Sequence, residues 1–238
     1  KDDVTDGWVG EVGARSQATT PQFAKYMIPA HEIYSMPAAS QAFLDDAGID
    51  VEAWLARKVS DRMARTEATA FVSGNGVARP YGFTSYASGT TWGQIEQVNS
   101  GHASQVLADG IITLAFSLKD PYAARATFLM NRTTIATVMK LKDGQGQYLW
   151  TMNLQLNQPA MLVGYPVRFA NDMAAVAANN LPIAFGDFAA GYLIVDRAGI
   201  RVLRDPYSSK PNVLFYTTRR VGGAVVDFDA IKLQKISA

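Results

Sequence analysis

A Gly-Asn-Gly turn at residues 74–76 is the first place in this sequence where the residue types suggest chemistry, because glycine-rich turns can bind phosphate. Phosphate sites place the glycines after a strand and before a helix, so that the positive helix N-terminus faces the anion. Here the glycines follow a segment with the apolar spacing of a helix, at the end that carries negative partial charge. The sequence therefore favours a turn that ends a helix over a phosphate site.

Metal-binding and nucleophilic side chains are scarce. The chain has two histidines, His31 and His102, and no cysteine. His31-Glu32 could begin a zinc-protease helix, but the second histidine of that motif would stand at position 35, which is a serine. The aspartates within residues 45–50 could hold a metal, although helix ends explain the same residues. No Gly-x-Ser-x-Gly elbow or Gly-Lys-Ser/Thr phosphate loop is present, so we expect no catalytic, cofactor-binding or metal site.

Composition describes a large globular chain. Its 238 residues are 48% hydrophobic and 18% charged, which is enough for one large domain or two joined ones. The chain has 22 basic and 21 acidic residues, so its net charge is only +1. A protein that wraps and reads duplex DNA needs a concentrated basic surface, which this composition does not indicate. No apolar run approaches the roughly 20 residues of a membrane helix. Nucleic acid, as a partner, would be contained rather than read.

Residues 50–73 are predicted to form one long helix. Neither glycine nor proline interrupts them, and apolar residues recur at every fourth position from Val51 to Met63. Asp50 suits the N-cap, and Gly74 suits a left-handed position that stops the helix. These features predict a helix of about six turns with one apolar side.

The rest of the sequence predicts an α+β fold. Residues 84–108 are polar and are expected to form an exposed connection. The C-terminal region predicts a hairpin, with strands at 213–221 and 224–228 and Gly222-Gly223 as its two-residue turn. Helices are expected at 39–47, 110–117 and 131–140, and further strands at 126–130, 162–165, 166–170, 183–185, 192–195 and 231–236.

A dozen short motifs, in the expected order, resemble the major capsid proteins of tailed bacteriophages, the Hong Kong 97-type family. The most recurrent of them is Gly74-Asn75-Gly76 followed by Pro80-Tyr81-Gly82. The resemblance covers essentially the whole chain. Its motifs lie within residues 8–11, 23–32, 44–46, 51–55, 67–82, 128–131, 142–150, 162–167, 185–188, 192–197, 204–206 and 220–233.

The resemblance implies an α+β capsid fold with a long spine helix over residues 50–73. It implies an extended loop, the E-loop, over residues 1–30 that reaches over a neighbouring subunit. The peripheral domain is expected to comprise residues 31–109 and 211–238, and the axial domain residues 110–210. The Lys–Asn cross-link of some members is not expected here, because Lys25 lies on the return strand of the loop.

The resemblance also implies a function. Such subunits are not enzymes; they assemble as pentamers and hexamers into an icosahedral shell that encloses double-stranded DNA inside a bacterial host. Expected partners are other copies of the chain, the contained DNA, a portal, a scaffold or maturation protease, and a decoration protein. Lys1 at the start of the chain is consistent with protease processing and equally with an ordering boundary.

Three alternatives stay open. Within the shell class, the chain could build a gene transfer agent or a domesticated prophage particle, which carries DNA without being an infectious virus. An encapsulin-like enzyme compartment shares the same fold. From a different class, a soluble enzyme or ligand-binding module would be a monomer at every concentration.

Subunit contacts are expected in two regions of the chain. The polar N-terminal segment cannot form a core by itself but can order on a neighbouring subunit. On the long helix, Arg57, Asp61 and Arg65 have the spacing of exposed i,i+4 ion pairs, each worth about 0.3–0.5 kcal/mol. The candidate interface residues are Trp8, Val9, Glu11, Arg15, Phe23, Arg57, Asp61 and Arg65.

Deleting residues 7–23 should abolish closed shells, because the segment that lies on the neighbouring subunit is lost. Electron micrographs of the purified variant and of the wild-type chain provide the measurement. Shells of normal shape from the deletion variant would contradict the predicted role of this segment.

Overall fold

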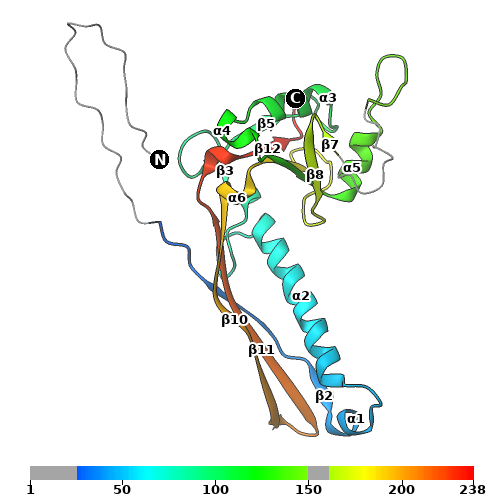
Figure 1. Ribbon diagram of the computed structural model, residues 1–238, viewed down its shortest axis with the longest axis vertical. Helices are drawn as coiled ribbons and strands as arrows, with labels where there is room; N and C mark the ends of the chain where they lie inside the picture. The colour runs from blue at the N-terminus through cyan, green and yellow to red at the C-terminus, as the bar shows by residue number, and fades with distance from the viewer. Residues whose placement is uncertain (1–25, 150–160) are drawn as a thin grey trace, which may run out of the picture.

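A helix of 23 residues, α2 (Val51–Ser73), forms one side of an elongated stem (Figure 1). The computed structural model describes residues 26–149 and 161–238. Beside α2 runs a long antiparallel hairpin made of β10 (Tyr192–Ser209) and β11 (Asn212–Val225). A head of short helices and a second sheet sits at the C-terminal end of α2, so the molecule consists of a stem and a head.

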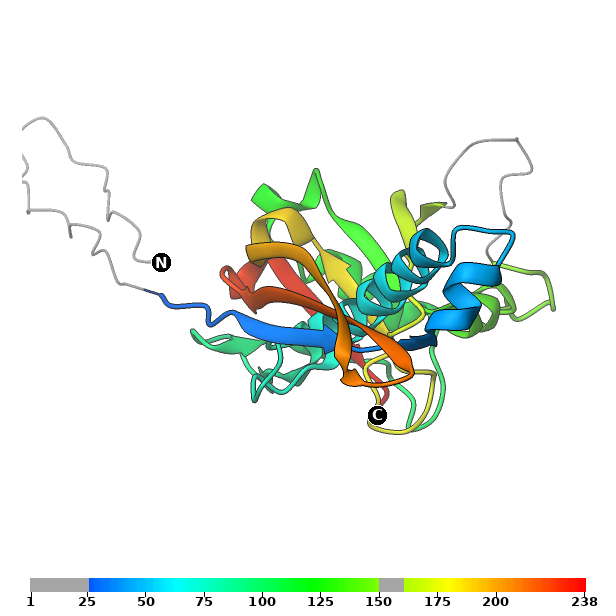
Figure 2. The same cartoon turned by 90° about the horizontal axis from the view of Figure 1, so that it is seen from below.

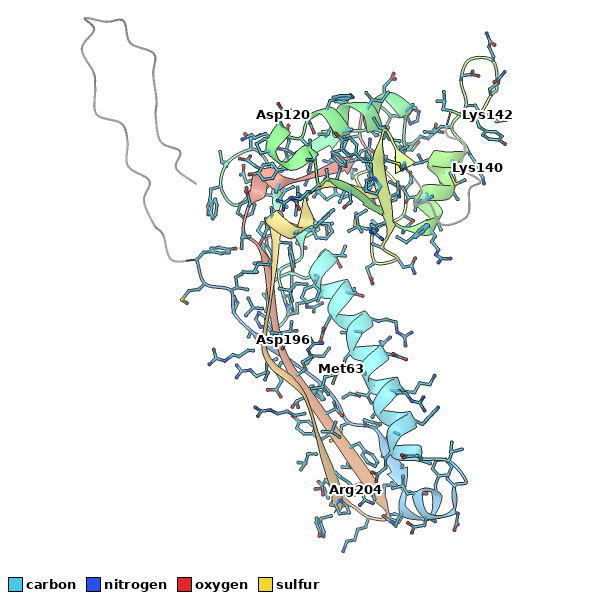
Figure 3. The ribbon with its side chains drawn as sticks, viewed as in Figure 1. Met63, Asp120, Lys140, Lys142, Asp196 and Arg204 are labelled. Atoms are coloured by element: carbon cyan, nitrogen blue, oxygen red, sulfur yellow. The ribbon has the colours of Figure 1, made fainter. Side chains whose placement is uncertain are left out.

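The local sequence explains where α2 begins. The backbone N–H of Ala53 donates to Asp50 Oδ1 at 2.9 Å, which confirms Asp50 as the N-cap. Val51, Val59 and Met63 are buried, so the predicted apolar ridge is the face that packs on the hairpin. Figure 3 shows Met63 between the helix and the strands.

The end of α2 differs from the prediction. Gly74 has a φ of −64° and is therefore not left-handed. A Cβ at this position would lie 2.1 Å from the carbonyl oxygen of Pro80 and 2.5 Å from that of Ala70. Glycine is needed here because two backbone segments approach each other closely, and the predicted left-handed stop was wrong.

The stem sheet is antiparallel and has the order β1-β11-β10, with β2 also pairing with β11. Strand β1 (His31–Ser35) lies on the first part of the edge and β2 (Ala38–Ser40) continues it. The short helix α1 (Gln41–Asp46) connects β2 to α2 at the far end of the stem (Figure 1). Figure 2 looks along the stem and shows α2 beside this sheet.

The C-terminal hairpin is not the one predicted. Strand β11 passes without interruption through Gly222-Gly223, and the turn lies at Lys210-Pro211, where Ser209 pairs with Asn212. A Cβ at Gly222 would lie 2.5 Å from the carbonyl oxygen of Pro29, the residue two before β1. The two glycines therefore allow close approach of neighbouring groups and make no turn, so the predicted turn was wrong.

The head is built on a six-stranded sheet with the order β5-β12-β9-β6-β8-β7. Ile183 and Phe185 of β9 belong to one buried cluster and Ala184 to another, so the sheet has a core on each face. Helices α3 and α5 contribute to the first core. The head strands are β5 (Gln97–Asn99), β6 (Thr127–Met130), β7 (Met161–Leu162), β8 (Tyr165–Phe169), β9 (Ile183–Gly186) and β12 (Ile231–Lys235).

The remaining elements are short. Asn131 caps α5 as predicted, since its Oδ1 accepts the backbone N–H of Thr134 at 2.7 Å. Strands β3 and β4 pair in parallel as a separate two-stranded sheet. Their bounds, with those of the helices, are α3 (Ala108–Phe116), α4 (Asp120–Ala123), α5 (Arg132–Met139), α6 (Phe188–Gly191), η1 (Phe83–Ser85), η2 (Phe228–Ala230), β3 (Ala87–Ser88) and β4 (Gln94–Ile95).

Two expected segments have a different place in the structure. Residues 84–108 supply strands of the head, and Ile95 is fully buried, so the prediction of an exposed connection was wrong. The expected axial segment, residues 110–210, includes β10, which lies in the stem. The expected peripheral segment 211–238 includes β12, which pairs with β9 and β5 in the head.

The motif at residues 70–83 joins the stem to the head. The backbone N–H of Tyr81 donates to the carbonyl oxygen of Gly223 at 3.0 Å, and the hydroxyl of Tyr192 donates to the carbonyl oxygen of Tyr81 at 3.0 Å. The hydroxyl of Thr84 donates to the carbonyl oxygen of Val72 at 2.7 Å. Burial raises the pKa of the Tyr192 phenol, which therefore stays protonated as a donor. The segment that follows α2 is thus bonded to both long strands through Tyr81.

An ion-pair network joins α2 to both strands of the hairpin. Arg219 of β11 donates from Nη1 to Glu67 Oε2 at 2.9 Å and from Nη2 to Asp196 Oδ2 at 2.7 Å. Glu67 is only 7% exposed, and burial raises the pKa of its carboxyl group while the Arg219 charge opposes that rise. Because one guanidinium bonds to two other elements, Arg219 fixes their relative positions.

Replacing Gly222 by alanine should lower the free energy of unfolding by about 1–3 kcal/mol, because the added methyl group meets the Pro29 carbonyl oxygen. The matched control is Gly199→Ala in β10, where no atom lies within 4 Å of an added Cβ. Urea denaturation of the two full-length variants measures the difference. Equal stabilities would show that the close approach at Gly222 carries no cost.

Replacing Arg219 by methionine should lower the free energy of unfolding by about 3 kcal/mol, because the carboxylate of Glu67 is left buried without a cation. Adding Glu67→Gln to this variant should restore part of the loss, since no buried charge then remains. Chemical denaturation of the single and double variants is the measurement. A double variant no more stable than Arg219→Met would contradict this explanation.

Candidate assembly interface

The predicted contact residues divide into two groups. Arg57, Asp61 and Arg65 are exposed on α2, and Arg65 Nε donates to the backbone carbonyl oxygen of Asp61 at 3.2 Å. Among the described residues, the Asp61 carboxylate forms no ion pair with either arginine, so the expected pairs within the helix are not formed. Within the described part of the chain, the three exposed charged groups are therefore available for contacts with another molecule. The others, Trp8, Val9, Glu11, Arg15 and Phe23, lie outside the described residues.

Strand β10 presents large apolar side chains to solvent on both of its faces. Val202 is 55% exposed, Leu203 is 61% exposed and Tyr207 is 82% exposed. The strand is also an edge of the stem sheet, so one side of its backbone is unpaired within the described chain. Exposed apolar side chains on a free strand edge are typical of a surface that another chain covers.

Further exposed apolar side chains lie elsewhere on the molecule. Those of the stem side include Tyr34, Met36, Phe43, Ile49 and Trp54. Those of the head include Ile112, Phe116, Tyr148, Leu149, Met161 and Phe169. Because these surfaces differ from one another and from β10, contacts between copies can be heterologous, which is the type that builds rings and shells.

A groove of about 430 Å³ separates the first half of α2 from the hairpin. Its walls include Leu55 and Val59 from the helix and Val202 and Phe215 from the strands. An exposed ion pair between Arg204 Nε and a Glu52 oxygen, at 3.2 Å, crosses from strand to helix in the same region. The groove is mainly apolar, and its lining includes Val202, so it adds to the exposed apolar surface on the helix-facing side of β10.

The sequence does not predict this surface. Residues 196–209 mix charges, Gly199 and Pro206 with few apolar residues, so their pattern indicates neither a strand nor an exposed side. The only available signal is the apolar pair Val202-Leu203 between Arg201 and Arg204. Consecutive residues on a strand point to opposite faces, so this pair places one exposed apolar side chain on each face of the edge strand.

The side chains that suggested chemistry are dispersed. His31 lies in β1 of the stem, whereas His102 lies in a loop of the head, where its Nδ1 accepts the backbone N–H of Ser104 at 3.1 Å. Within residues 26–149 and 161–238, no three His, Asp or Glu side chains are grouped so as to hold a metal ion. In the same residues, no helix is long and apolar enough to cross a membrane. The described residues thus present exposed surfaces suited to contacts with other molecules.

Comparison with known proteins agrees with such surfaces. The model of the phage capsid family matches residues 1–236. Among solved structures, the capsid of a native GTA particle is 46% identical, with a TM-score of 0.92, over 100% of this chain and 82% of that chain. The structure from Gordonia phage Cozz is 13% identical, with a TM-score of 0.67, over 100% of this chain and 79% of that chain.

An encapsulin is also similar in fold. SrpI of Synechococcus elongatus PCC 7942 is 13% identical, with a TM-score of 0.64, over 87% of this chain and 74% of that chain. No curated protein matches the chain by sequence. Identities of 13% show a shared fold alone, whereas the family model and the GTA capsid match the sequence along its whole length. The chain therefore belongs to the phage capsid family, as its motifs predicted, and has the mixed α+β capsid fold.

Proposed function

We propose that this chain is the shell subunit of a gene transfer agent, a particle that encloses double-stranded DNA without being an infectious virus. The observation that carries the proposal is the 46% identity to the GTA capsid over the whole chain, compared with 13% for the Gordonia phage. A capsid subunit of an infectious phage was the first expectation from the sequence. The difference in identity favours the alternative within the same class.

The surfaces of the subunit support assembly with other copies of itself. The stem exposes apolar side chains along β10 and on its other elements, and the head exposes further ones. A single chain leaves these surfaces in water, whereas pentamers and hexamers would cover them against neighbours. Arg57 and Asp61 on the exposed face of α2 are suited to charged contacts at the rim of such an interface.

We assign the peripheral role to the stem and the axial role to the head. The stem contains the spine helix α2 and the paired strands β10 and β11, so its boundary falls near residue 192 rather than at residue 210. The head includes the C-terminal strand β12. Residues 1–30 retain their expected role as an E-loop that lies on a neighbour, for which the groove beside β10 is a suitable surface.

The remaining partners follow from the proposed particle. Double-stranded DNA would be held by containment, which agrees with a net charge of only +1 per subunit. A portal, a scaffold or maturation protease and a decoration protein are the further partners of such a shell. Assembly would take place in the cytoplasm of the bacterial host.

Purified particles from the native host should appear as closed shells of uniform diameter by negative-stain microscopy, because the subunit has several distinct contact surfaces. Sequencing of the enclosed DNA should return fragments drawn from the whole host genome. A single repeated viral genome would identify an infectious phage instead. Shells that hold protein cargo would indicate an encapsulin-like compartment, and a chain that stays monomeric at every concentration would overturn the shell function.

A further inference from the structure

A second groove, of about 330 Å³, lies on the last turns of α2. Arg62, Thr66, Thr69 and Ser73 follow each other at spacings of three and four, and so share one face of the helix. Arg79, from the loop after the helix, completes the wall. Figure 3 shows side chains of α2 projecting away from the hairpin, on the side opposite the strands that cover Met63. The remaining lining residues are Arg65, Ala70 and Gly74.

The arginines of this groove have no acidic partner within the described residues. Arg62 and Arg79 form no ion pair there, and Arg65 donates only to the backbone carbonyl oxygen of Asp61. A nearby carboxylate belongs to Asp172, whose Oδ1 accepts the hydroxyl of Thr69 at 2.6 Å. Arg79 also borders a smaller cavity lined by two glutamates. Three guanidinium groups therefore form a local excess of positive charge on an otherwise balanced chain.

The dipole of α2 does not favour an anion in this groove, which lies at the C-terminal end of the helix. The C-terminal end of α2 carries a partial negative charge of about half an elementary charge. Three full positive charges from Arg62, Arg65 and Arg79 exceed it, so the groove as a whole attracts anions. The arginines, rather than the helix end, are the groups that would hold the ligand.

The lining distinguishes between two kinds of anionic ligand. Protein interfaces take most of their binding energy from large apolar or aromatic anchors, and this groove contains none. Burying three arginines against one carboxylate of a neighbour would leave charge uncompensated, which is costly. Phosphates repeated along a duplex can neutralise all three, and the planar guanidinium group matches phosphate oxygens with two hydrogen bonds.

The hydroxyl groups fit the same ligand. Those of Thr66 and Ser73 donate to backbone carbonyl oxygens one turn earlier in their own helix, at 3.1 and 3.2 Å. They can rotate to donate to a phosphate oxygen, as Ser and Thr side chains do in many protein–DNA contacts. Neither hydroxyl reads a base, so the contact would be independent of DNA sequence.

We propose that this groove binds phosphate groups of the duplex DNA enclosed by the shell. The proposal rests on the proposed function and adds to it a wall contact for the contained DNA. Each groove neutralises two or three phosphates, so a single contact is weak and depends on salt. Repetition over all subunits of a shell adds many such contacts to one DNA molecule.

The solution test uses the full chain in unassembled form and a short, fluorescently labelled DNA duplex of random sequence. The binding constant K is measured over a series of salt concentrations, and log K is plotted against log salt. The plot has a negative slope, and in Arg62→Gln/Arg79→Gln this slope should be less steep by about 2 than in the wild-type chain. The matched control, Arg197→Gln/Arg201→Gln, removes two exposed charges from β10 and should leave the slope unchanged. Equal slopes for both double variants would overturn the proposal.

The particle test uses shells that contain DNA. Ultraviolet cross-linking followed by mass spectrometry should place DNA adducts on the peptides that span residues 62–79 in wild-type particles, and fewer in Arg62→Gln/Arg79→Gln. Absence of adducts from this segment would overturn the proposal. A double variant that loses shell assembly but keeps the wild-type salt slope would show that the groove binds a neighbouring subunit.

Failure of the proposed function gives a different result. If the wild-type chain forms no shells or its shells hold no DNA, the gene-transfer-agent function fails. The salt slope of the full chain on duplex DNA would still report whether Arg62 and Arg79 bind phosphate. The two proposals are thus tested separately.

Discussion

The contact between Arg219, Glu67 and Asp196 is the interaction on which the stem depends. One guanidinium on β11 bonds to a carboxylate on α2 and to another on β10, so three elements are held at one point. Glu67 is buried, and a buried carboxylate is tolerated only next to a cation. Burial of the apolar ridge of α2 stabilises the packing of the helix on the sheet, but the hydrophobic effect is non-directional and does not fix the position of the helix along the sheet. The charged contact selects one register of the helix on the sheet.

The same register places the junction between the stem and the head. With α2 fixed, Gly74 at its C-terminal end lets the backbone of Pro80 approach closely, and Gly223 lets the ring of Phe71 approach. The backbone N–H of Tyr81 then donates to the carbonyl oxygen of Gly223. Tyr192 then closes the contact from the start of β10. The head cannot rotate about the stem without breaking these bonds. Surfaces on the two parts therefore keep the fixed relation that a closed shell requires of its subunits.

The features that the sequence predicted correctly are local. Helix α2 was predictable because the N-cap residue Asp50 and the apolar residues at every fourth position are both visible within the segment. Gly222-Gly223 was misread because a glycine for close approach and a glycine for a turn look identical until the contacting residue, Pro29, is known. Pairing of β12 with β5 joins residues far apart in the chain, which periodicity does not report. Helical periodicity does not predict the second groove either, because Arg79 comes from a loop after α2 and its position against the helix depends on how that loop folds back.

A container for DNA must satisfy two opposing electrostatic requirements. A strongly basic wall would bind the duplex tightly and resist its release, whereas a wall without cations would leave the DNA unguided. This chain is nearly neutral overall, yet one groove holds three arginines that have no acidic partner within residues 26–149 and 161–238. Under the proposed wall contact, salt weakens each small contact steeply, so many such grooves would hold DNA in a crowded shell and release it one contact at a time. Local concentration of charge on a neutral subunit is thus a physical means of holding DNA reversibly.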